Sequence, residues 1–184
     1  MQTLMMHQPL LISSLLCHAE RHHGEQEIVS RRVEGDIHHY RFRDLASRAR
    51  RLANALSSLG VERGTRVATL AWNGYRHMEL YYAISGSGAV LHTLNPRMHA
   101  DQLAWIADHA RDEALFFDLT FLPLVESIAA RLPAIKAFIA VTGLKSMKDS
   151  ITGSWVQPDW GSAAKGVPLN RWGFQPGIEK SRSC

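Results

Sequence analysis

Four short apolar segments begin 23, 25 and 23 residues apart, and this spacing constrains the fold more than any other feature. The segments are 66–71, 89–94, 114–117 and 137–141. Short, continuous apolar segments are typical of strands covered on both faces. Three stretches with apolar residues at helical spacing lie between them, over 75–85, 99–109 and 119–132. This alternation predicts an α/β fold, with a parallel sheet built from right-handed βα repeats.

The residues before this repeat predict two helices and a hairpin. Apolar residues recur at three- and four-residue steps over 42–59, which predicts an amphipathic helix capped by Gly60. A shorter helical pattern begins at Leu10, and Gly24 is expected to end it. Between these helices, the turn cluster Glu34-Gly35-Asp36 separates two β-prone stretches and predicts a hairpin.

The composition changes after Thr142. Residues 1–142 contain 14 Arg and 1 Lys, whereas residues 143–184 contain 2 Arg and 4 Lys. The βα rhythm stops there, so we predict an α/β body over 1–142 and an irregular tail over 143–184. The switch in composition indicates a different reading frame or a different source of sequence for the tail. Trp155, Trp160 and Trp172 leave open a second hypothesis, in which the tail anchors a protein partner.

Charge and cysteine content exclude several classes of protein. The formal charge of +4 is small and scattered, so nucleic-acid binding is not expected. The densest basic stretch, Arg48, Arg50 and Arg51, is interpreted as solvated helix surface. Two cysteines at opposite ends are no disulfide framework, which suits a reducing, cytoplasmic compartment. No transmembrane segment and no signal peptide are expected.

Candidate binding residues follow the predicted strands, because ligands of such sheets bind beyond the carboxyl ends of strands. These positions are Trp72-Asn73-Gly74, Asn95-Pro96-Arg97, Asp118 and Thr142. A rigid proline turn would hold Arg97 at the rim, where a guanidinium suits forked contacts with phosphate. A solvated loop is the alternative for the same residues.

Other chemistry has weak support in the sequence. The ten histidines include His18 and His22 on one predicted helical face, but no third ligand follows at a known spacing, so no metal site is predicted. Asp112 and Glu113 precede a strand and are interpreted as solvated. No catalytic residue is assigned.

Several motifs in order resemble the acyl-CoA synthetases of the adenylate-forming superfamily, especially the medium- and long-chain fatty-acid ligases. The resemblance runs from about Leu10 to Thr142 and is most specific over 88–97, Gly-Ala-Val-Leu-His-Thr-Leu-Asn-Pro-Arg. It implies an amino-terminal subdomain of an enzyme that converts fatty acid and ATP to acyl-AMP, from which CoA then displaces AMP. The intact family uses ATP, Mg²⁺ and CoA. Arg97 matches an arginine that lies near the CoA phosphate in some relatives.

The chain departs from the family in three ways. Thr65 stands where members carry Asp, and Arg41 stands where Ser or Thr often caps a helix. The family's Ser/Thr/Gly-rich phosphate loop, its Tyr-Gly-x-Thr-Glu motif and its carboxy-terminal Lys do not occur in these 184 residues. The resemblance therefore implies that this chain is inactive by itself, and no cofactor is expected for the isolated chain. Exposed sheet edges would favour self-association.

Overall fold

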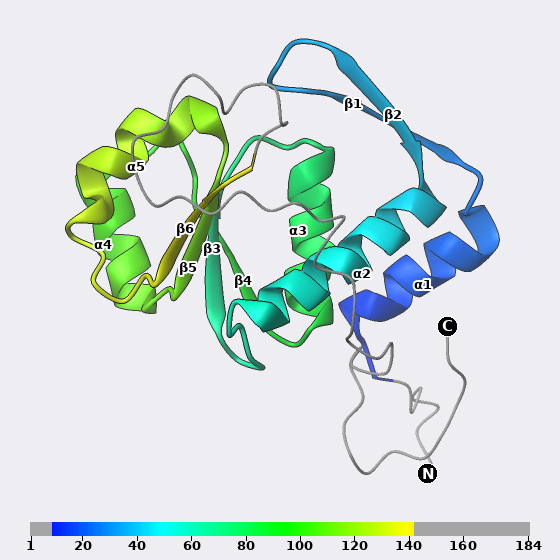
Figure 1. Cartoon of the computed structure of the whole chain (residues 1–184), viewed down its shortest axis with the longest axis horizontal. Coiled ribbons are helices and arrows are strands. Elements are labelled where there is room, and N and C mark those ends of the chain that lie inside the picture. Colours follow the sequence, from blue (N-terminus) through cyan, green and yellow to red (C-terminus); the bar gives the residue numbers. More distant parts are fainter. Residues whose placement is uncertain (1–8, 142–184) are drawn as a thin grey trace, which may run out of the picture.

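The structure, a computed structural model, describes residues 9–141 of the 184-residue chain. Its centre is a four-stranded parallel sheet with the strand order β4-β3-β5-β6 (Figure 1). The strands are β3 (Arg66–Leu70), β4 (Val90–Thr93), β5 (Ala114–Phe117) and β6 (Ala137–Ala140). The predicted α/β fold and its four parallel strands are confirmed.

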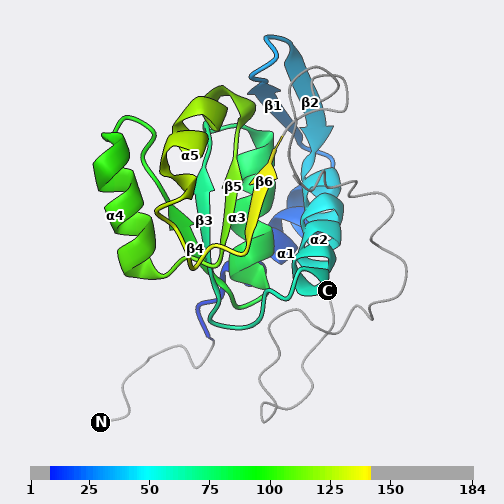
Figure 2. The ribbon, with the colours of Figure 1, turned by 60° about the vertical axis from the view of Figure 1, so that its left-hand side comes forward.

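Helices cover both faces of this sheet (Figure 2). One face packs against α3 (Tyr75–Gly86), which in turn contacts α1 (Ile12–His23) and α2 (Phe42–Ser58). The other face packs against α4 (Ala100–Ala110) and α5 (Leu122–Ala129), which follows the 3-10 turn η1 (Leu119–Phe121). Successive strand residues alternate between the two layers, so Phe116 faces α3 while Phe117 faces α5. Both rings are fully buried, and burial of such a side chain stabilises the fold by about 1.5–3 kcal/mol.

The strand order opens a crevice at the carboxyl ends of the strands. The chain leaves β3 toward α3 on one face, and it leaves the neighbouring β4 toward α4 on the other. The two loops therefore diverge, which is the geometry that creates ligand sites in open α/β sheets.

Helix α2 forms where the apolar stripe predicts it. Leu45, Leu52 and Leu56 are buried, and Gly60 adopts φ 79°, a left-handed conformation that glycine tolerates after a helix. Arg41 has no side-chain acceptor and forms no side-chain cap, but the carboxylate of Asp44 in the first turn accepts the Arg41 N–H at 3.0 Å. This is one of the two hydrogen bonds of a capping box, the one in which the third helical residue accepts from the backbone of the cap residue.

The interpretation of Arg48 and Arg50 as solvated surface is wrong. Arg48 donates twice to Glu79 of α3, at 2.5 and 3.2 Å, and the Glu79 side chain is only 3% exposed. Arg50 pairs with Glu20 and so links α2 to α1. Each arginine therefore joins α2 to a different neighbouring helix.

The predicted hairpin is also confirmed. Strand β1 (Glu27–Arg31) pairs antiparallel with β2 (Ile37–Arg41), with Ile28 opposite Tyr40 and Ser30 opposite His38. In Figure 1 the hairpin projects beyond the sheet, above the amino-terminal end of α3. Gly35 at its tip has φ 97°.

Asp112 contradicts the expectation of a solvated carboxylate. It is fully buried two residues before β5, and its carboxylate lies 2.7 Å from Nδ1 of His92 on β4. Its neighbour Glu113 is only partly buried and pairs with Lys136 at 2.6 Å. Among the helices within 9–141, none is long and apolar enough to cross a membrane.

Candidate functional site

A hollow of about 310 Å³ opens at the carboxyl ends of β3 and β4. One wall comes from the loop after β3 and the first turn of α3, and the other from the end of β4 and its loop. The lining residues are Ala71, Trp72, Asn73, His77, Thr93, Leu94, Asn95, Pro96 and Arg97. Two of the strand-end segments predicted from the sequence therefore meet in one site.

Arg97 lies on the rim of this hollow with its side chain exposed. The turn before it is fixed by the side-chain oxygen of Asn95, which accepts the Arg97 N–H at 3.0 Å, and by a bond from the Met98 N–H to the Asn95 carbonyl at 3.1 Å. Within residues 9–141 the Arg97 guanidinium forms no ion pair. Its donors are thus available to an anion that enters the hollow.

Asp118, which follows β5, supports the wall of the hollow formed by the loop after β3. Its carboxylate accepts the backbone N–H of Trp72 at 2.7 Å and ties the end of β5 to the end of β3. The indole N–H of Trp72 donates to the hydroxyl of Thr120 at 3.2 Å, and Phe121 packs against the ring at 5.0 Å. Burial raises the pKa of Asp118, and the Trp72 N–H offsets part of that rise. The third predicted strand end therefore positions the wall and does not line the hollow.

His77 is the lining residue that sequence reasoning missed. It lies in the first turn of α3 and shares a 3.1 Å hydrogen bond with Thr69 of β3. Burial lowers the pKa of His77, which favours a neutral ring at pH 7. Its place in the first turn of the helix that follows a predicted strand was the available signal, but only the fold brings it to Thr69.

A second hollow, of about 560 Å³, adjoins the first and shares Asn73, His77 and Thr93 with it. Its remaining lining is mostly apolar or aromatic, and it comes from the β1 strand and from α3. Those residues are Ile28, Val29, Ser30, Gly74, Tyr75, Met78, Tyr81 and Tyr82.

The remaining candidates have separate outcomes. The His18 and His22 rings do share one face of α1, 4.6 Å apart. Within residues 9–141, no three His, Cys, Asp or Glu side chains are grouped to hold a metal ion. Thr142 and the tryptophans of the tail lie outside the described residues, so the partner hypothesis and the boundary at 142 stay predictions.

The first hollow combines groups suited to an anionic ligand with a flat ring. A guanidinium can form forked bonds to phosphate, and the side-chain amides of Asn73 and Asn95 can donate or accept. The Trp72 side chain is about 45% exposed, which leaves an indole face for stacking. We find no nucleophile paired with a base among its lining residues.

Comparison with known proteins identifies the architecture. The family model described as "AMP-binding enzyme" matches residues 17–170, a span that includes every residue lining the two hollows. The chain belongs to the AMP-binding enzyme family. It is 51% identical over 135 residues to a 3-methylmercaptopropionyl-CoA ligase of Ruegeria lacuscaerulensis. It is 44% identical over 135 residues to a medium-chain fatty-acid–CoA ligase of Ectopseudomonas oleovorans.

These alignments cover 73% of this chain but only 25% of each relative, so the chain spans about a quarter of their length. The fold also matches the crystal structure of the anthranilate CoA ligase AuaEII in complex with anthranoyl-AMP, with a TM-score of 0.64. That match has 22% identity and covers 73% of this chain and 26% of the other. The resemblance to acyl-CoA synthetases seen in the motifs is confirmed.

Proposed function

We propose that this AMP-binding chain is the amino-terminal part of an ATP-dependent ligase that joins an aliphatic carboxylic acid to CoA. The observation that carries the proposal is the 51% identity to a CoA ligase across 135 residues. In the proposed reaction the acid attacks ATP to give acyl-AMP and release pyrophosphate. The CoA thiol then attacks the acyl carbonyl, and AMP leaves.

The acid proposed is a medium- or long-chain fatty acid. One relative is named for a medium-chain fatty acid, which supports this class. The relative with 51% identity is named for 3-methylmercaptopropionate, a short acid with a thioether, so this acid belongs in any substrate panel.

Arg97 is proposed to contact a phosphate of the CoA nucleotide. Its support is the exposed guanidinium on the rim of the first hollow, held there by the Asn95 turn. Trp72, across the same hollow, offers a face for the adenine ring. This wall would orient CoA, while the reacting atoms would be held elsewhere in the enzyme.

The chain alone is proposed to be inactive. Adenylyl transfer depends on charged groups and metal ions that stabilise the negative charge of the phosphates in the transition state. The family motifs that would supply these groups are not present in the sequence. The described residues also bring no metal-binding group together.

A chimera tests the proposed function directly. Residues 17–141 would replace the matching segment of the Ruegeria lacuscaerulensis ligase, and formation of acyl-CoA would be measured with octanoate, dodecanoate and 3-methylmercaptopropionate. We expect the chimera to form thioester with at least one of these acids. A folded chimera that forms acyl-AMP and thioester with none of them would contradict the proposal.

The same chimera tests Arg97. The variant Arg97→Gln should raise the KM for CoA about tenfold, a loss of about 1.4 kcal/mol of charge-assisted binding, while the rate of ATP–pyrophosphate exchange stays unchanged. Arg63→Gln, an exposed arginine in the turn before β3, is the matched control and should leave the KM for CoA unchanged. Equal KM values in the wild-type and Arg97→Gln chimeras would remove Arg97 from the CoA site.

A further inference from the structure

The β1–β2 hairpin is seated on the start of α3 through one aromatic cluster. The imidazole of His38 stacks on the ring of Tyr75, with centroids 3.9 Å apart and planes at 23°. Tyr40 packs edge-on against Tyr75 at 5.7 Å. The Ser30 hydroxyl accepts the backbone N–H of Tyr75 at 3.0 Å. These contacts join the inner face of the hairpin to a single turn of helix.

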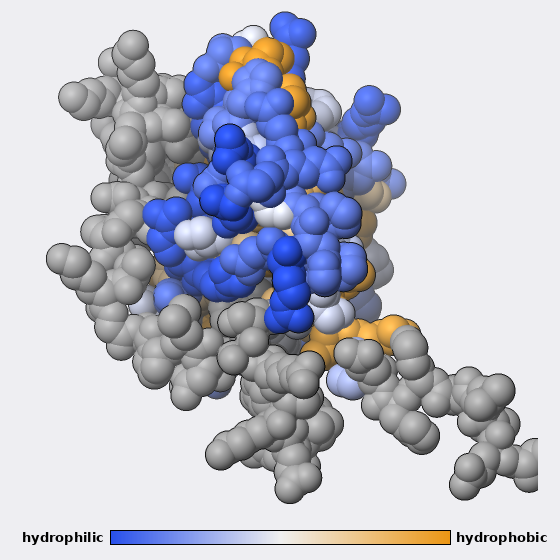
Figure 3. Space-filling view, turned by 90° about the vertical axis from the view of Figure 1, so that its right-hand side faces the viewer, coloured by the Kyte–Doolittle hydropathy of each residue, from blue (hydrophilic) through white to orange (hydrophobic). Residues whose placement is uncertain are grey.

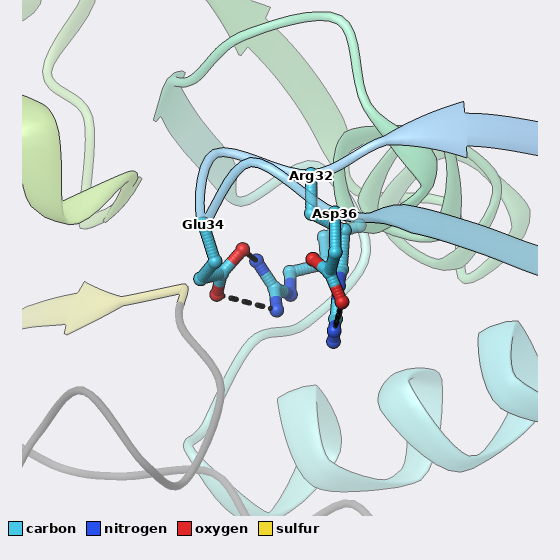
Figure 4. A network of polar contacts seen from close by, with 4 residues as sticks. Arg32, Glu34 and Asp36 are labelled. Carbon is cyan, nitrogen blue, oxygen red and sulfur yellow. Dashed lines mark hydrogen bonds and ion pairs between the residues drawn. The ribbon is translucent and has the colours of Figure 1, made fainter.

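The charges around His38 are already balanced. Three arginines face it, one each from the hairpin tip, α2 and α3, and each is paired with a carboxylate. The pairs are Arg32–Asp36, Arg48–Glu79 and Arg76–Glu34. Figure 4 shows Arg32, Glu34 and Asp36 together at the hairpin tip. A proton on His38 would add a fourth cation, and none of these carboxylates is left to pair with it.

The position of the ring also opposes that proton. The Nε2 atom of His38 is buried and has no hydrogen-bond partner among the described residues. Burial lowers the pKa of His38, and Arg48, Arg32 and Arg76 lower it further, while Asp36 raises it in part. Burial raises the pKa of the Tyr40 hydroxyl, which also faces the ring, so it offers no negative charge to balance a proton on His38 near pH 7. The seated hairpin therefore favours a neutral His38.

The hairpin is also a wall of the second hollow. Ile28, Val29 and Ser30 of β1 line it, opposite Met78 and Tyr81 of α3. The outer side of the hairpin is exposed. Its inner side is held to α3 by the aromatic cluster, by the Ser30–Tyr75 hydrogen bond and by the ion pair of Glu34 with Arg76. Movement of the hairpin away from α3 would widen this hollow and free the N–H of Tyr75.

We propose that the β1–β2 hairpin is a pH-sensitive cover over the second hollow, latched by neutral His38 on Tyr75 and released when His38 takes up a proton. The direction follows from linkage. A histidine that is harder to protonate when docked stabilises the docked state above its free pKa of about 6.5, and that contribution is lost as the pH falls below it. This proposal does not depend on the proposed CoA ligase activity.

Hydrogen exchange on the full 184-residue chain tests the latch. Protection of amides in 28–40 would be measured by mass spectrometry at pH 7.5 and 5.5, corrected for intrinsic exchange, with peptides from β3 and β5 as the internal reference. We expect hairpin protection to fall by about threefold or more at the lower pH relative to that reference. Equal protection at the two pH values would overturn the proposal.

Two variants assign the effect to His38. His38→Gln removes the titration, so the ratio of protection between the two pH values should fall to one, whatever its absolute level. His39→Gln is the matched control, because His39 is exposed and pairs with Glu27 on the outer side. It should keep the wild-type ratio. A ratio that persists in His38→Gln, or that vanishes in His39→Gln, would overturn the assignment.

A third variant keeps the test informative if His38→Gln releases the hairpin from α3 at both pH values. Arg32→Gln removes one cation that opposes the proton and leaves Asp36 beside the ring. Its hairpin should therefore show a smaller pH-dependent loss than the wild type. An unchanged or larger loss would contradict the electrostatic basis of the latch.

Discussion

Replacing Glu79 with leucine would leave Arg48 without its carboxylate between α2 and α3. Glu79 accepts both hydrogen bonds of this pair, and its side chain is 3% exposed against 31% for Arg48. Burial raises the pKa of Glu79, and the bonds to Arg48 offset only part of that rise. Burying the two charges of this pair therefore costs desolvation free energy, and the attraction between the two side chains offsets part of that cost.

The magnitude follows from this exposure. Breaking a buried ion pair from one side costs about 3–5 kcal/mol, because a charge is left buried alone. Water reaches part of Arg48, so we expect Glu79→Leu to cost about 2–4 kcal/mol. The double variant Arg48→Met/Glu79→Leu removes both charges and should unfold within about 1 kcal/mol of the wild type.

Urea denaturation followed by far-ultraviolet circular dichroism checks this pattern. At a slope of about 1.5 kcal/mol per M, the Glu79→Leu midpoint should fall by about 1–3 M, and the double variant should recover most of it. Glu20→Gln, which breaks the more exposed pair with Arg50, should cost under about 1 kcal/mol. A double variant as unstable as Glu79→Leu would refute the reasoning, because the loss would then come from packing.

Three further outcomes are expected. Asp118→Ala should lower the free energy of unfolding by about 1–3 kcal/mol, because it leaves the Trp72 N–H unpaired. Asp118→Asn keeps an acceptor and should stay within about 1 kcal/mol of the wild type. Equal urea midpoints for the two variants would count against a stabilising role for the Asp118–Trp72 hydrogen bond. Gly88→Ala should cost about 1–2 kcal/mol, because φ is 85° and the new Cβ would lie 3.3 Å from Arg63; a midpoint equal to wild type would show that the turn relaxes freely. The purified chain should elute ahead of a monomer on gel filtration, because edge strand β4 leaves Val90 48% exposed, and a sharp monomer peak would exclude this association.

The face seen in Figure 3 is mostly hydrophilic, with hydrophobic residues confined to small areas. Exposed apolar side chains include Val33 and Ile37 of the hairpin and Leu15 of α1. Scattered apolar residues of this kind are ordinary on a folded surface, so the sheet edges remain the better candidates.

The sequence predicted the sheet well because its strands are covered on both faces. Such strands are continuously apolar, and their 23- to 25-residue spacing leaves room for one crossover helix each. The same logic located Asn95-Pro96-Arg97, since a turn that follows a buried strand must lie at the carboxyl edge of the sheet.

Pairs between distant residues were beyond this reasoning. Arg48 and Glu79 are 31 residues apart, and His92 and Asp112 are 20 apart, so no local pattern showed that these charges are buried together. His77 was missed for the same reason, because its partner Thr69 lies across a strand-to-helix turn. Periodicity reports which face of an element is apolar, but not which polar side chains meet on it.

The central proposal is that this AMP-binding chain carries one wall of a CoA ligase and not its adenylation chemistry. ATP–pyrophosphate exchange by the purified 184-residue chain tests it most directly, with octanoate, dodecanoate and 3-methylmercaptopropionate as acids and the chimera as the positive control. The account predicts exchange by the chimera and none by the chain alone. Acid-dependent exchange by the chain alone that persists after any contaminating ligase has been removed would contradict it.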